Sequence, residues 1–323
     1  MFISIDLGGT NIRGTWISPE GECGQVILRP RPQHLEGTKD TLLDLVRTLS
    51  AQAPEQVQGI GLATAGPLDH RKRMYLHTTN MPELNHFRVG EFLENQVDIP
   101  VRMENDAQAA ALGEVWAGGL AGTANAVVVT LGTGVGSGVI MNHEVWRAGH
   151  FTGPELGDVY IGPGPKRRCA IGPGSVRSCG CGQVGCAEAW LQKQTLTDLI
   201  NRGSFAVEDP KEIFPRLQAQ DQGALRILHI YGRRLGLYLS VLQVIFGFTS
   251  LGISGGLSAF FPYFEQGMWA TLRYRFRQRE WWLPERIVPS PDPEMSALLG
   301  MARVFVLESR GSTDWKPEDE GGQ

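Results

Sequence analysis

The sequence predicts an α/β protein built from two similar halves. Strand and helix patterns alternate along the whole chain. A short strand, a Gly-Thr turn and a second strand open the chain, and the same arrangement returns near residue 126. The length of 323 residues suits about two domains. We therefore expect a first domain over residues 1–118, completed by a helix at 295–308, and a second domain over 119–294.

Hydrophobic residues make up 42% of the chain and charged residues 20%, with a net charge of −4. This balance is typical of a soluble globular enzyme and argues against a nucleic-acid partner. An uncharged stretch over 235–264 is interrupted by glycines and Pro262, so we interpret it as a buried helix followed by a strand, and not as a membrane span. No secretory signal pattern is visible, and clustered cysteines favour a reducing compartment. We therefore expect a cytoplasmic protein.

The first half contains four predicted strands and three predicted helices. Apolar residues at helical spacing mark the first helix, and an alanine-rich run marks the third. The predicted strands are Phe2–Leu7, with Gly14–Ile17 as its hairpin partner, Gly59–Ala63 and Val101–Glu104, and the predicted helices are Thr38–Gln52, Phe87–Glu94 and Asp106–Ala117.

The second half opens with an apolar strand at Ala126–Thr130. A Gly-, Pro- and Cys-rich stretch over 149–185 is expected to form a long structured loop. A long helix at Ala224–Phe246 and a strand at Ser250–Ser254 follow, then the last helix at Met295–Glu308. The polar residues 309–323 are expected to be a disordered tail.

Two glycine turns, each directly after a strand, are the first functional signal. In the segment Asp6-Leu-Gly-Gly-Thr-Asn11, glycine lets backbone amides approach a phosphate, and Asp6 could hold Mg²⁺ directly or through water. The run Leu131–Gly138 repeats the pattern and precedes no obvious helix, which argues against a dinucleotide fold. Two phosphate-binding turns with a carboxylate between them suit phosphoryl transfer from ATP to a hydroxyl.

The carboxylate in question is Asp106, at a predicted strand-to-helix junction. A carboxylate beside an acceptor hydroxyl can take its proton as the new bond to phosphorus forms. Asn105 or Asp106 could equally serve as the N-cap of the helix, so a purely structural reading stays open.

Cys179, Cys181 and Cys186 form a compact cluster of three soft ligands, which suits a structural Zn²⁺. A fourth ligand is missing from the cluster. Asp158, His150 and Cys169 are the candidates, and three free thiols in a loop are the alternative.

Taken together, these segments resemble the ROK family (repressor, open reading frame, kinase), over Phe2 to about Ala302. That resemblance implies an actin-like ATPase (ribonuclease H-like) fold with duplicated βββαβα-type halves and a cleft between two domains. The segments that carry it are Gly61–Asp69, Asn105-Asp106, Gly132-Thr-Gly134, Ser254-Gly-Gly256 and Cys179–Glu188.

The resemblance implies an ATP-dependent sugar kinase that is a homodimer, glucokinase-like, with Mg²⁺ and structural Zn²⁺. Asp106 would deprotonate the 6-hydroxyl of a hexose, with glucose as the default. The implied sugar contacts are Asn80, Asn105, Asp106, Glu155, Asp158 and Glu188. The implied nucleotide contacts are Asp6, Gly8, Gly9, Thr10, Asn11, Gly132, Thr133, Gly134, Gly255 and Gly256. The implied metal ligands are Cys179, Cys181, Cys186 and Asp158.

One departure from the family pattern bears on both metal and sugar. Asp158 stands where the family has a zinc-ligating histidine, and Pro154 lies beside the preceding glutamate. The alternatives are therefore an N-acetylglucosamine or N-acetylmannosamine kinase, a non-catalytic sugar-binding protein, or a sugar-sensing regulator. Because the first motif begins at Asp6, we expect no DNA-binding domain before it. Polyphosphate is an alternative donor, with Lys166-Arg167-Arg168 as the only hint.

Overall fold

The computed structural model describes residues 1–78, 80–147, 153–162, 179, 181–203 and 205–311. His150, Cys169, the 166–168 basic run and residues 312–323 of the predicted tail lie outside them. The chain divides into two compact units. Unit 1 comprises Met1–Ala124, Gly138–Pro154 and Pro291–Gln323, and unit 2 comprises Asn125–Ser137 and Glu155–Ser290.

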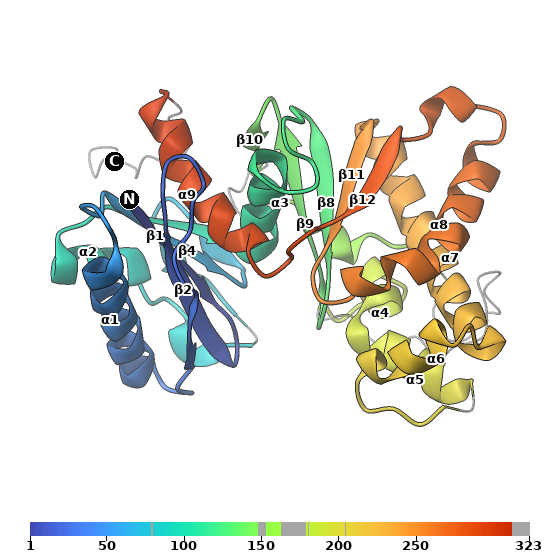
Figure 1. Ribbon diagram of the computed structural model, residues 1–323, viewed down its shortest axis with the longest axis horizontal. Helices are drawn as coiled ribbons and strands as arrows, with labels where there is room; N and C mark the ends of the chain where they lie inside the picture. The colour runs from blue at the N-terminus through green and yellow to red at the C-terminus, as the bar shows by residue number, and fades with distance from the viewer. Residues whose placement is uncertain (79, 148–152, 163–178, 180, 204, 312–323) are drawn as a thin grey trace. The chain divides into compact units, whose positions relative to one another are not determined.

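The sheet of unit 1 has five strands in the order β3-β2-β1-β4-β7 (Figure 1). The first three form an antiparallel meander, and β4 and β7 continue it in parallel with β1. Their bounds are β1 Phe2–Leu7, β2 Asn11–Ile17, β3 Ile27–Pro30, β4 Gly59–Thr64 and β7 Val101–Asn105. Its helices are α1 Leu35–Gln52, α2 Val89–Val97, α3 Asp106–Trp116 and α9 Ser296–Ser309, with short elements β5 Leu68–Asp69, β6 Met74–Tyr75 and the 3-10 turn η1 Pro82–Leu84.

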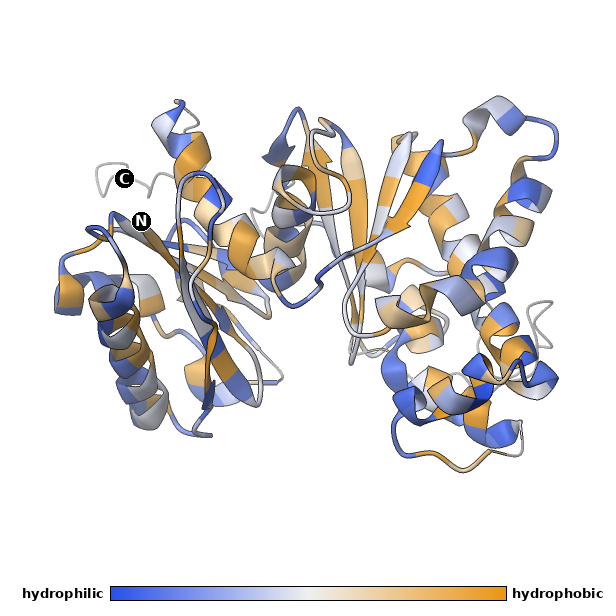
Figure 2. Cartoon of the chain, in the orientation of Figure 1, coloured by the Kyte–Doolittle hydropathy of each residue, from blue (hydrophilic) through white to orange (hydrophobic). Residues whose placement is uncertain are grey.

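Alternate side chains of β1 face opposite sides of this sheet. Ile3, Ile5 and Leu7 join a core with the apolar face of α1. Phe2 joins a second core with α9, where its ring stacks on Phe305 at 5.1 Å between centroids. The two-residue period of a strand therefore gives both faces a helical cover, and Figure 2 shows the hydrophobic colour running along the central strands.

The second sheet repeats this topology, in the order β10-β9-β8-β11-β12. Its strands are β8 Ala126–Leu131, β9 Val135–Met141, β10 Glu144–Val145, β11 Ser250–Ser254 and β12 Arg286–Pro289. The end of β9 and β10 belong to unit 1, where Gly138 approaches α3 so closely that an added Cβ would lie 2.4 Å from Ala111 Cβ. The predicted α/β class with duplicated halves is thus confirmed.

Unit 2 is otherwise helical. Two of its helices, α7 and α8, pack with almost no space between their backbones, because a Cβ at Gly232 would lie 2.0 Å from the Phe264 carbonyl oxygen. Its helices are α4 Ala187–Leu191, α5 Lys193–Arg202, α6 Phe214–Gln218, α7 Gln222–Phe246 and α8 Phe261–Phe276, with 3-10 turns η2 Leu156–Asp158, η3 Pro210–Ile213, η4 Ser258–Phe260 and η5 Glu280–Trp282.

The uncharged stretch is resolved as predicted, since α7 ends at Gly247 with left-handed backbone and β11 follows. None of the described helices is long and apolar enough to span a membrane. Several predicted boundaries differ from the observed ones by a few residues, as at α2 and β2. The start of α1 has an identifiable cause: the helix begins at Leu35 and not at Thr38, because His34 Nδ1 accepts a hydrogen bond from the Gly37 amide at 3.1 Å and caps the helix. Histidine is not among the residues that usually signal an N-cap.

Candidate active site

The first glycine turn connects β1 and β2 and lines a pocket of about 460 Å³ in unit 1. The Gly8 amide donates to the Asn11 carbonyl at 2.9 Å, which closes the turn. Gly9 has open space where a Cβ would stand. The pocket is lined by Asp6, Gly8, Thr10, Asn11, Arg13, Val26, Leu28 and Glu294. Four of the five residues predicted to contact the nucleotide in this segment therefore line one pocket.

Arg13 is a residue of this pocket that the sequence reasoning missed. It pairs with Asp6 across the β1–β2 ladder, and its Nη2 and Nε lie 2.7 and 2.8 Å from Asp6 Oδ2. Both contacts go to the same carboxylate oxygen. A cation bound at Asp6 would therefore use Oδ1 or compete with Arg13.

Asp106 lies at the junction of β7 and α3. Asn105 is the N-cap, since its Oδ1 accepts hydrogen bonds from the amides of Ala107 and Gln108 at 3.0 and 3.3 Å. The alternative left open by the sequence is thereby decided in favour of Asn105. Asp106 retains an exposed side chain that accepts one bond, at 2.7 Å, from the Ala107 amide.

The parallel strands bring Asp106 and the first turn to the same edge of the sheet. Asp6, Ala63 and Glu104 lie in one row across β1, β4 and β7. The turn and the start of α3 therefore both follow the carboxyl ends of these strands, where α/β folds commonly place their ligands.

Burial raises the pKa of Asp106 to about 6, and the negative charge of Asp6 adds to the effect. Many protein atoms surround the Asp106 carboxyl group, which accounts for the effect of burial on its pKa. The side chain nevertheless remains accessible to solvent. Hydrogen bonds from the backbone act in the opposite direction. A carboxyl group with this pKa is ionised at neutral pH yet accepts a proton more readily than an ordinary aspartate.

A buried ion pair stands directly behind this junction. Glu104 Oε2 accepts from Arg147 Nε and Nη2 at 2.9 and 2.7 Å, and both side chains are nearly inaccessible to solvent. Glu104 Oε1 accepts from the Asn105 amide at 2.9 Å. The pair therefore fixes the backbone that carries Asn105 and Asp106. Glu104 was visible in the Glu-Asn-Asp motif, but no local signal pointed to Arg147.

The second glycine turn, Gly132–Gly134, belongs to unit 2. The Gly132 amide donates to the Gly134 carbonyl at 3.0 Å, and the Lys193 amide donates to the Gly132 carbonyl at 2.7 Å. Gly255, with φ of +80°, packs against Leu131 at the start of this turn. The structure therefore places the Gly255-Gly256 pair beside the second turn, as residues of one nucleotide site would need to be.

Glu188 lies in the first turn of α4, and its side chain reaches the second glycine turn. Its Oε2 accepts from the Val135 amide at 3.3 Å, and its Oε1 lies 3.6 Å from Cys179 Sγ. The predicted sugar contact Glu188 thus links the second turn to the cysteine cluster. The other predicted sugar contacts fall in both units: Asn80 is exposed in unit 1, and Glu155 is exposed in unit 2 at the residue before η2.

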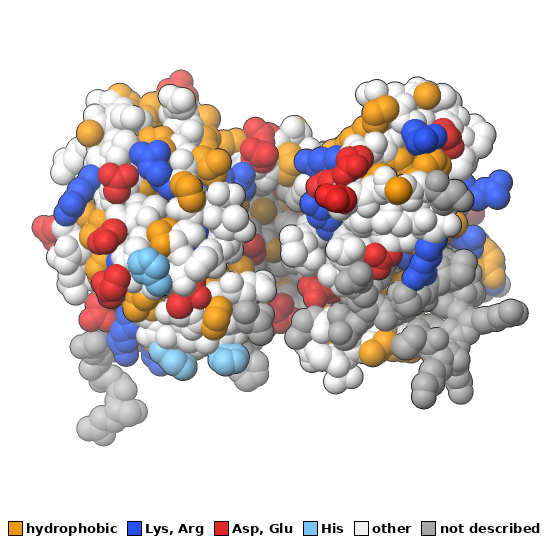
Figure 3. Space-filling model, turned by 90° about the horizontal axis from the view of Figure 1, so that it is seen from below, with side chains coloured by type: hydrophobic (Ala, Val, Ile, Leu, Met, Phe, Trp, Pro, Cys, Tyr) orange, Lys and Arg blue, Asp and Glu red, His pale blue; other side chains and the backbone are white. Residues whose placement is uncertain are grey.

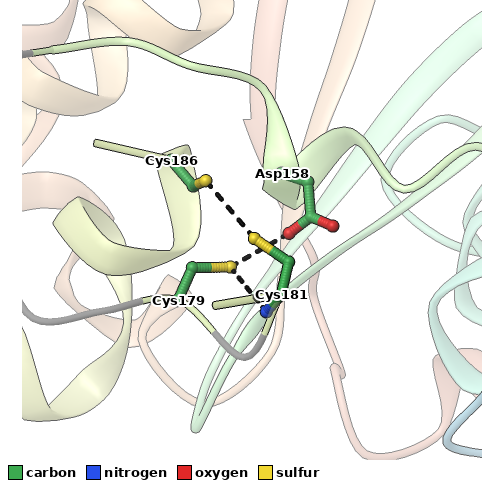
Figure 4. Close-up of side chains that lie close together, drawn as sticks. All are labelled: Asp158, Cys179, Cys181 and Cys186. Carbon is green, nitrogen blue, oxygen red and sulfur yellow. Dashed lines mark hydrogen bonds between the residues drawn. The ribbon is translucent and has the colours of Figure 1, made fainter. Parts of the chain in front are cut away.

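The four predicted metal ligands converge in unit 2 (Figure 4). The ligand atoms of Asp158, Cys179, Cys181 and Cys186 all lie within 4.8 Å of one another. Cys179 Sγ is 3.0 Å from Asp158 Oδ1, and Cys181 Sγ is 3.6 Å from Cys186 Sγ. Three thiols and one carboxylate at these separations suit a tetrahedral cation.

Ionising this cluster without a cation is unfavourable. Burial raises the pKa of Cys179, and the carboxylate of Asp158 raises it further. Burial also raises the pKa of Cys186, with Cys181 as the next cause. A divalent cation would remove this penalty, because it stabilises thiolates directly.

Over the part of the chain that the structure describes, the face drawn in Figure 3 has no region dominated by charge of one sign. Acidic and basic side chains are interspersed over the described residues of the face drawn in Figure 3. The described residues of that face therefore form no broad basic patch, in agreement with the modest net charge.

Comparison with known proteins accounts for these features together. A model of the ROK family matches residues 2–307. The chain belongs to the ROK family. A solved ROK-family glucokinase from Streptomyces griseus, in complex with glucose and AMPPNP, superposes with a TM-score of 0.77 at 25% identity, over 94% of this chain and 98% of that one. The actin-like ATPase fold expected from the resemblance is thereby confirmed.

Two curated ROK relatives have different acceptors in their names. A glucokinase of Halalkalibacterium halodurans is 25% identical over 276 residues, which are 80% of each chain. An N-acetylmannosamine kinase of Haemophilus influenzae is 25% identical over 256 residues, which are 79% of this chain and 80% of that one. The similarity to the two is equal in identity, so identity does not choose between their acceptors.

Proposed function

We propose that this ROK protein is a sugar kinase that transfers the γ-phosphoryl group of ATP to the 6-hydroxyl of a hexose. The observation that carries the proposal is Asp106, which has a pKa of about 6 and lies at the same sheet edge as the first glycine turn. A general base and a phosphate-binding turn at one edge are what phosphoryl transfer to a hydroxyl requires. Membership of a family that includes sugar kinases supports it.

In the proposed reaction, ionised Asp106 accepts the proton of the sugar hydroxyl. The hydroxyl oxygen then forms its bond to the γ-phosphorus while the bond from that phosphorus to the bridging oxygen breaks, and ADP leaves with that electron pair. Amides of the Gly8–Thr10 turn and of the Gly132–Gly134 turn would hold the phosphates. Mg²⁺, when bound, would neutralise charge on the β- and γ-phosphates, with Asp6 as its protein contact.

Glucose is the acceptor we propose, and N-acetylmannosamine or N-acetylglucosamine is the second candidate. These sugars differ at carbon 2, so the proposed contacts from Asn80, Asn105, Glu155, Asp158 and Glu188 could serve each of them. The curated N-acetylmannosamine kinase relative is the observation that favours the second candidate.

Zinc is the cation we propose for the cysteine cluster. Three thiolates select a soft or borderline cation over Mg²⁺, and Asp158 would take the fourth position. Because Glu188 lies beside both Cys179 and the second turn, the metal would set the position of a proposed sugar contact. We also expect a cytoplasmic homodimer.

The test is ADP release with Mg-ATP against a panel of hexoses and N-acetylhexosamines. A higher rate of ADP release with glucose than with the other sugars supports the full proposal. ADP release with an N-acetylhexosamine alone would make that sugar the acceptor. Sugar binding by thermal shift without turnover, using ATP or polyphosphate, would contradict a kinase and favour a sugar-sensing or inactive protein.

A further inference from the structure

A buried arginine, Arg31, donates hydrogen bonds to the backbone of the first glycine turn. Arg31 directly follows β3, and its side chain is 0% exposed. Its Nε and Nη2 donate to the Gly9 carbonyl at 3.0 and 2.8 Å, and its backbone amide donates to the Thr10 carbonyl at 2.8 Å. Two donors from one rigid guanidinium on a single oxygen fix the direction of that carbonyl.

The direction of the Gly9 carbonyl also fixes the next amide. In a trans peptide the C=O of one residue and the N–H of the following residue point to opposite sides. With the Gly9 carbonyl directed at Arg31, the N–H of Thr10 is directed away from it. Gly9 and Thr10 are exposed, and Thr10 lines the pocket described above. Arg31 therefore aims an amide that the proposed function assigns to a phosphate.

The same guanidinium contacts a second segment. Its Nη1 forms an ion pair with Glu83 in η1, three residues after Asn80. Although burial acts to raise the pKa of Glu83, the hydrogen bond from Arg31 lowers it overall. The segment is internally tied, since Thr78 Oγ1 donates to the Met81 carbonyl at 2.6 Å and the Thr78 amide donates to Asn85 Oδ1 at 2.7 Å. A displacement there would therefore reach Glu83.

Breaking the ion pair between Arg31 and Glu83 would be costly. Separating Glu83 from a guanidinium with no exposure would leave a buried charge uncompensated, which is strongly unfavourable. We therefore expect Glu83, Arg31 and the Gly9–Thr10 peptide to move together.

We propose that Arg31 is a positioning residue that couples nucleotide binding at the first turn to sugar binding at the segment around Asn80. The inference rests on the proposed sugar kinase function. Sugar that contacts Asn80 fixes Glu83, Glu83 fixes Arg31, and Arg31 fixes the Thr10 amide that meets the phosphates. By thermodynamic linkage, nucleotide must then tighten sugar binding by the same factor as sugar tightens nucleotide binding.

The experiment measures the Kd of Mg-AMPPNP by calorimetry, with and without saturating acceptor sugar. The acceptor is the one identified by the ADP-release panel. The variants are Arg31→Lys, which keeps the charge but loses the fork, and Glu83→Gln, which keeps an acceptor oxygen but loses the ion pair. Arg29→Lys is the matched control, because Arg29 lies on β3, two residues before Arg31, and its ion pair is with an exposed partner, Asp44, at 3.5 Å.

In the wild type we expect sugar to tighten nucleotide binding by about fivefold or more. Arg31→Lys should weaken nucleotide binding about tenfold and bring this factor to within twofold of one. In Glu83→Gln, sugar should no longer tighten nucleotide binding. The nucleotide Kd of this variant without sugar should stay within about threefold of the wild-type value. Arg29→Lys should behave as the wild type.

An unchanged coupling factor in Glu83→Gln overturns the inference, as does a wild type that turns over sugar without any coupling, and both leave the proposed function standing. A wild type that neither binds Mg-AMPPNP nor turns over any sugar overturns the proposed function itself. Should Arg31→Lys fail to fold, Glu83→Gln decides alone, since the Arg31 guanidinium keeps the Gly9 and Pro32 carbonyls and Gln33 Oε1 as acceptors in that variant.

Discussion

The two glycine turns occupy equivalent places in two sheets of the same topology, yet opposite charges support them. In unit 1 a cation, Arg31, holds a carbonyl oxygen of the turn. In unit 2 an anion, Glu188, accepts a hydrogen bond from the amide that follows the turn, and a cysteine cluster lies behind it. A duplicated backbone has therefore kept its turn and changed the chemistry that holds the turn in place.

The proposed proton acceptor is a further asymmetry between the two units. The carboxylate with the raised pKa, Asp106, belongs to unit 1, whereas the candidate metal ligands all belong to unit 2. We infer that unit 1 supplies the acid–base chemistry and that unit 2 supplies a metal-supported frame. The predictions below test this division of labour, from the largest expected effect to the smallest.

Asp106→Asn should lower kcat by about 10²–10⁴, because the amide cannot accept the hydroxyl proton. The binding of sugar, measured by calorimetry, should change by no more than about threefold, since the amide keeps a hydrogen-bonding oxygen. Asp44→Asn is the control, because Asp44 is an exposed carboxylate whose ion pair with Arg29 is long, at 3.5 Å. A kcat close to wild type in Asp106→Asn would remove Asp106 as the base.

Removal of the metal should affect unit 2 and spare the sheet of unit 1. We expect about one zinc per chain, and Cys181→Ser should lose the metal and lower Tm by roughly 6 °C, as the loss of about 3 kcal/mol would produce. Hydrogen exchange should show lost protection in α4 and β8, with β1 and β4 unchanged.

Asp158→His is the informative companion, because histidine is an equally good zinc ligand and should retain the metal. Freshly purified wild-type protein without stoichiometric zinc, or equal loss of protection in both sheets, would contradict the assignment of the metal to unit 2.

The activity should follow the ionisation of Asp106. Since burial and Asp6 raise its pKa to about 6, kcat/KM should be level above pH 7 and about tenfold lower at pH 5. The measurement is a rate profile from pH 5 to 8, with circular dichroism at each pH to verify folding. A profile that is level down to pH 5 would mean that another group, or none, accepts the proton.

The same raised pKa predicts a small gain in stability for Asp106→Asn. A carboxyl group with a folded pKa near 6 and an unfolded pKa near 3.9 opposes folding when it is ionised. That cost is fully present above pH 6, declines as the pH falls, and is absent below about 3.9. Because solvent reaches the side chain, we discount it to about 1 kcal/mol, or roughly 2 °C in Tm.

Asp106→Asn should therefore melt about 2 °C above the wild type at pH 8 and at the same temperature at pH 4. The comparison needs only thermal melts at the two pH values, with Asp44→Asn alongside. A variant less stable than the wild type at pH 8 would show that the Asp106 carboxylate stabilises the fold.

What the sequence could predict was set by local signals. Glycine after a short strand identified both turns, and the cysteine spacing identified three thiols that the fold brings together. Arg31 and Arg147 carried no such signal. Their partners lie 22 to 52 residues away, at Gly9, Glu83 and Glu104, so only the folded chain brings these groups together.

Local rules left the N-cap of one helix undecided and missed the start of another. At α3 both Asn105 and Asp106 satisfied the capping preference, and the choice depended on which side chain the β7 strand turned toward the free amides. At α1 an unusual histidine cap gave no residue-type signal.

The position of α9 has a consequence for synthesis on the ribosome. This helix covers one face of the first sheet, where Gly61 leaves only enough room for Met301 and Phe2 stacks on Phe305. All of unit 2 precedes it in the chain. We therefore expect unit 2 to complete its fold before unit 1. The sheet of unit 1 is synthesised first, but one of its faces stays uncovered until α9 has left the ribosome.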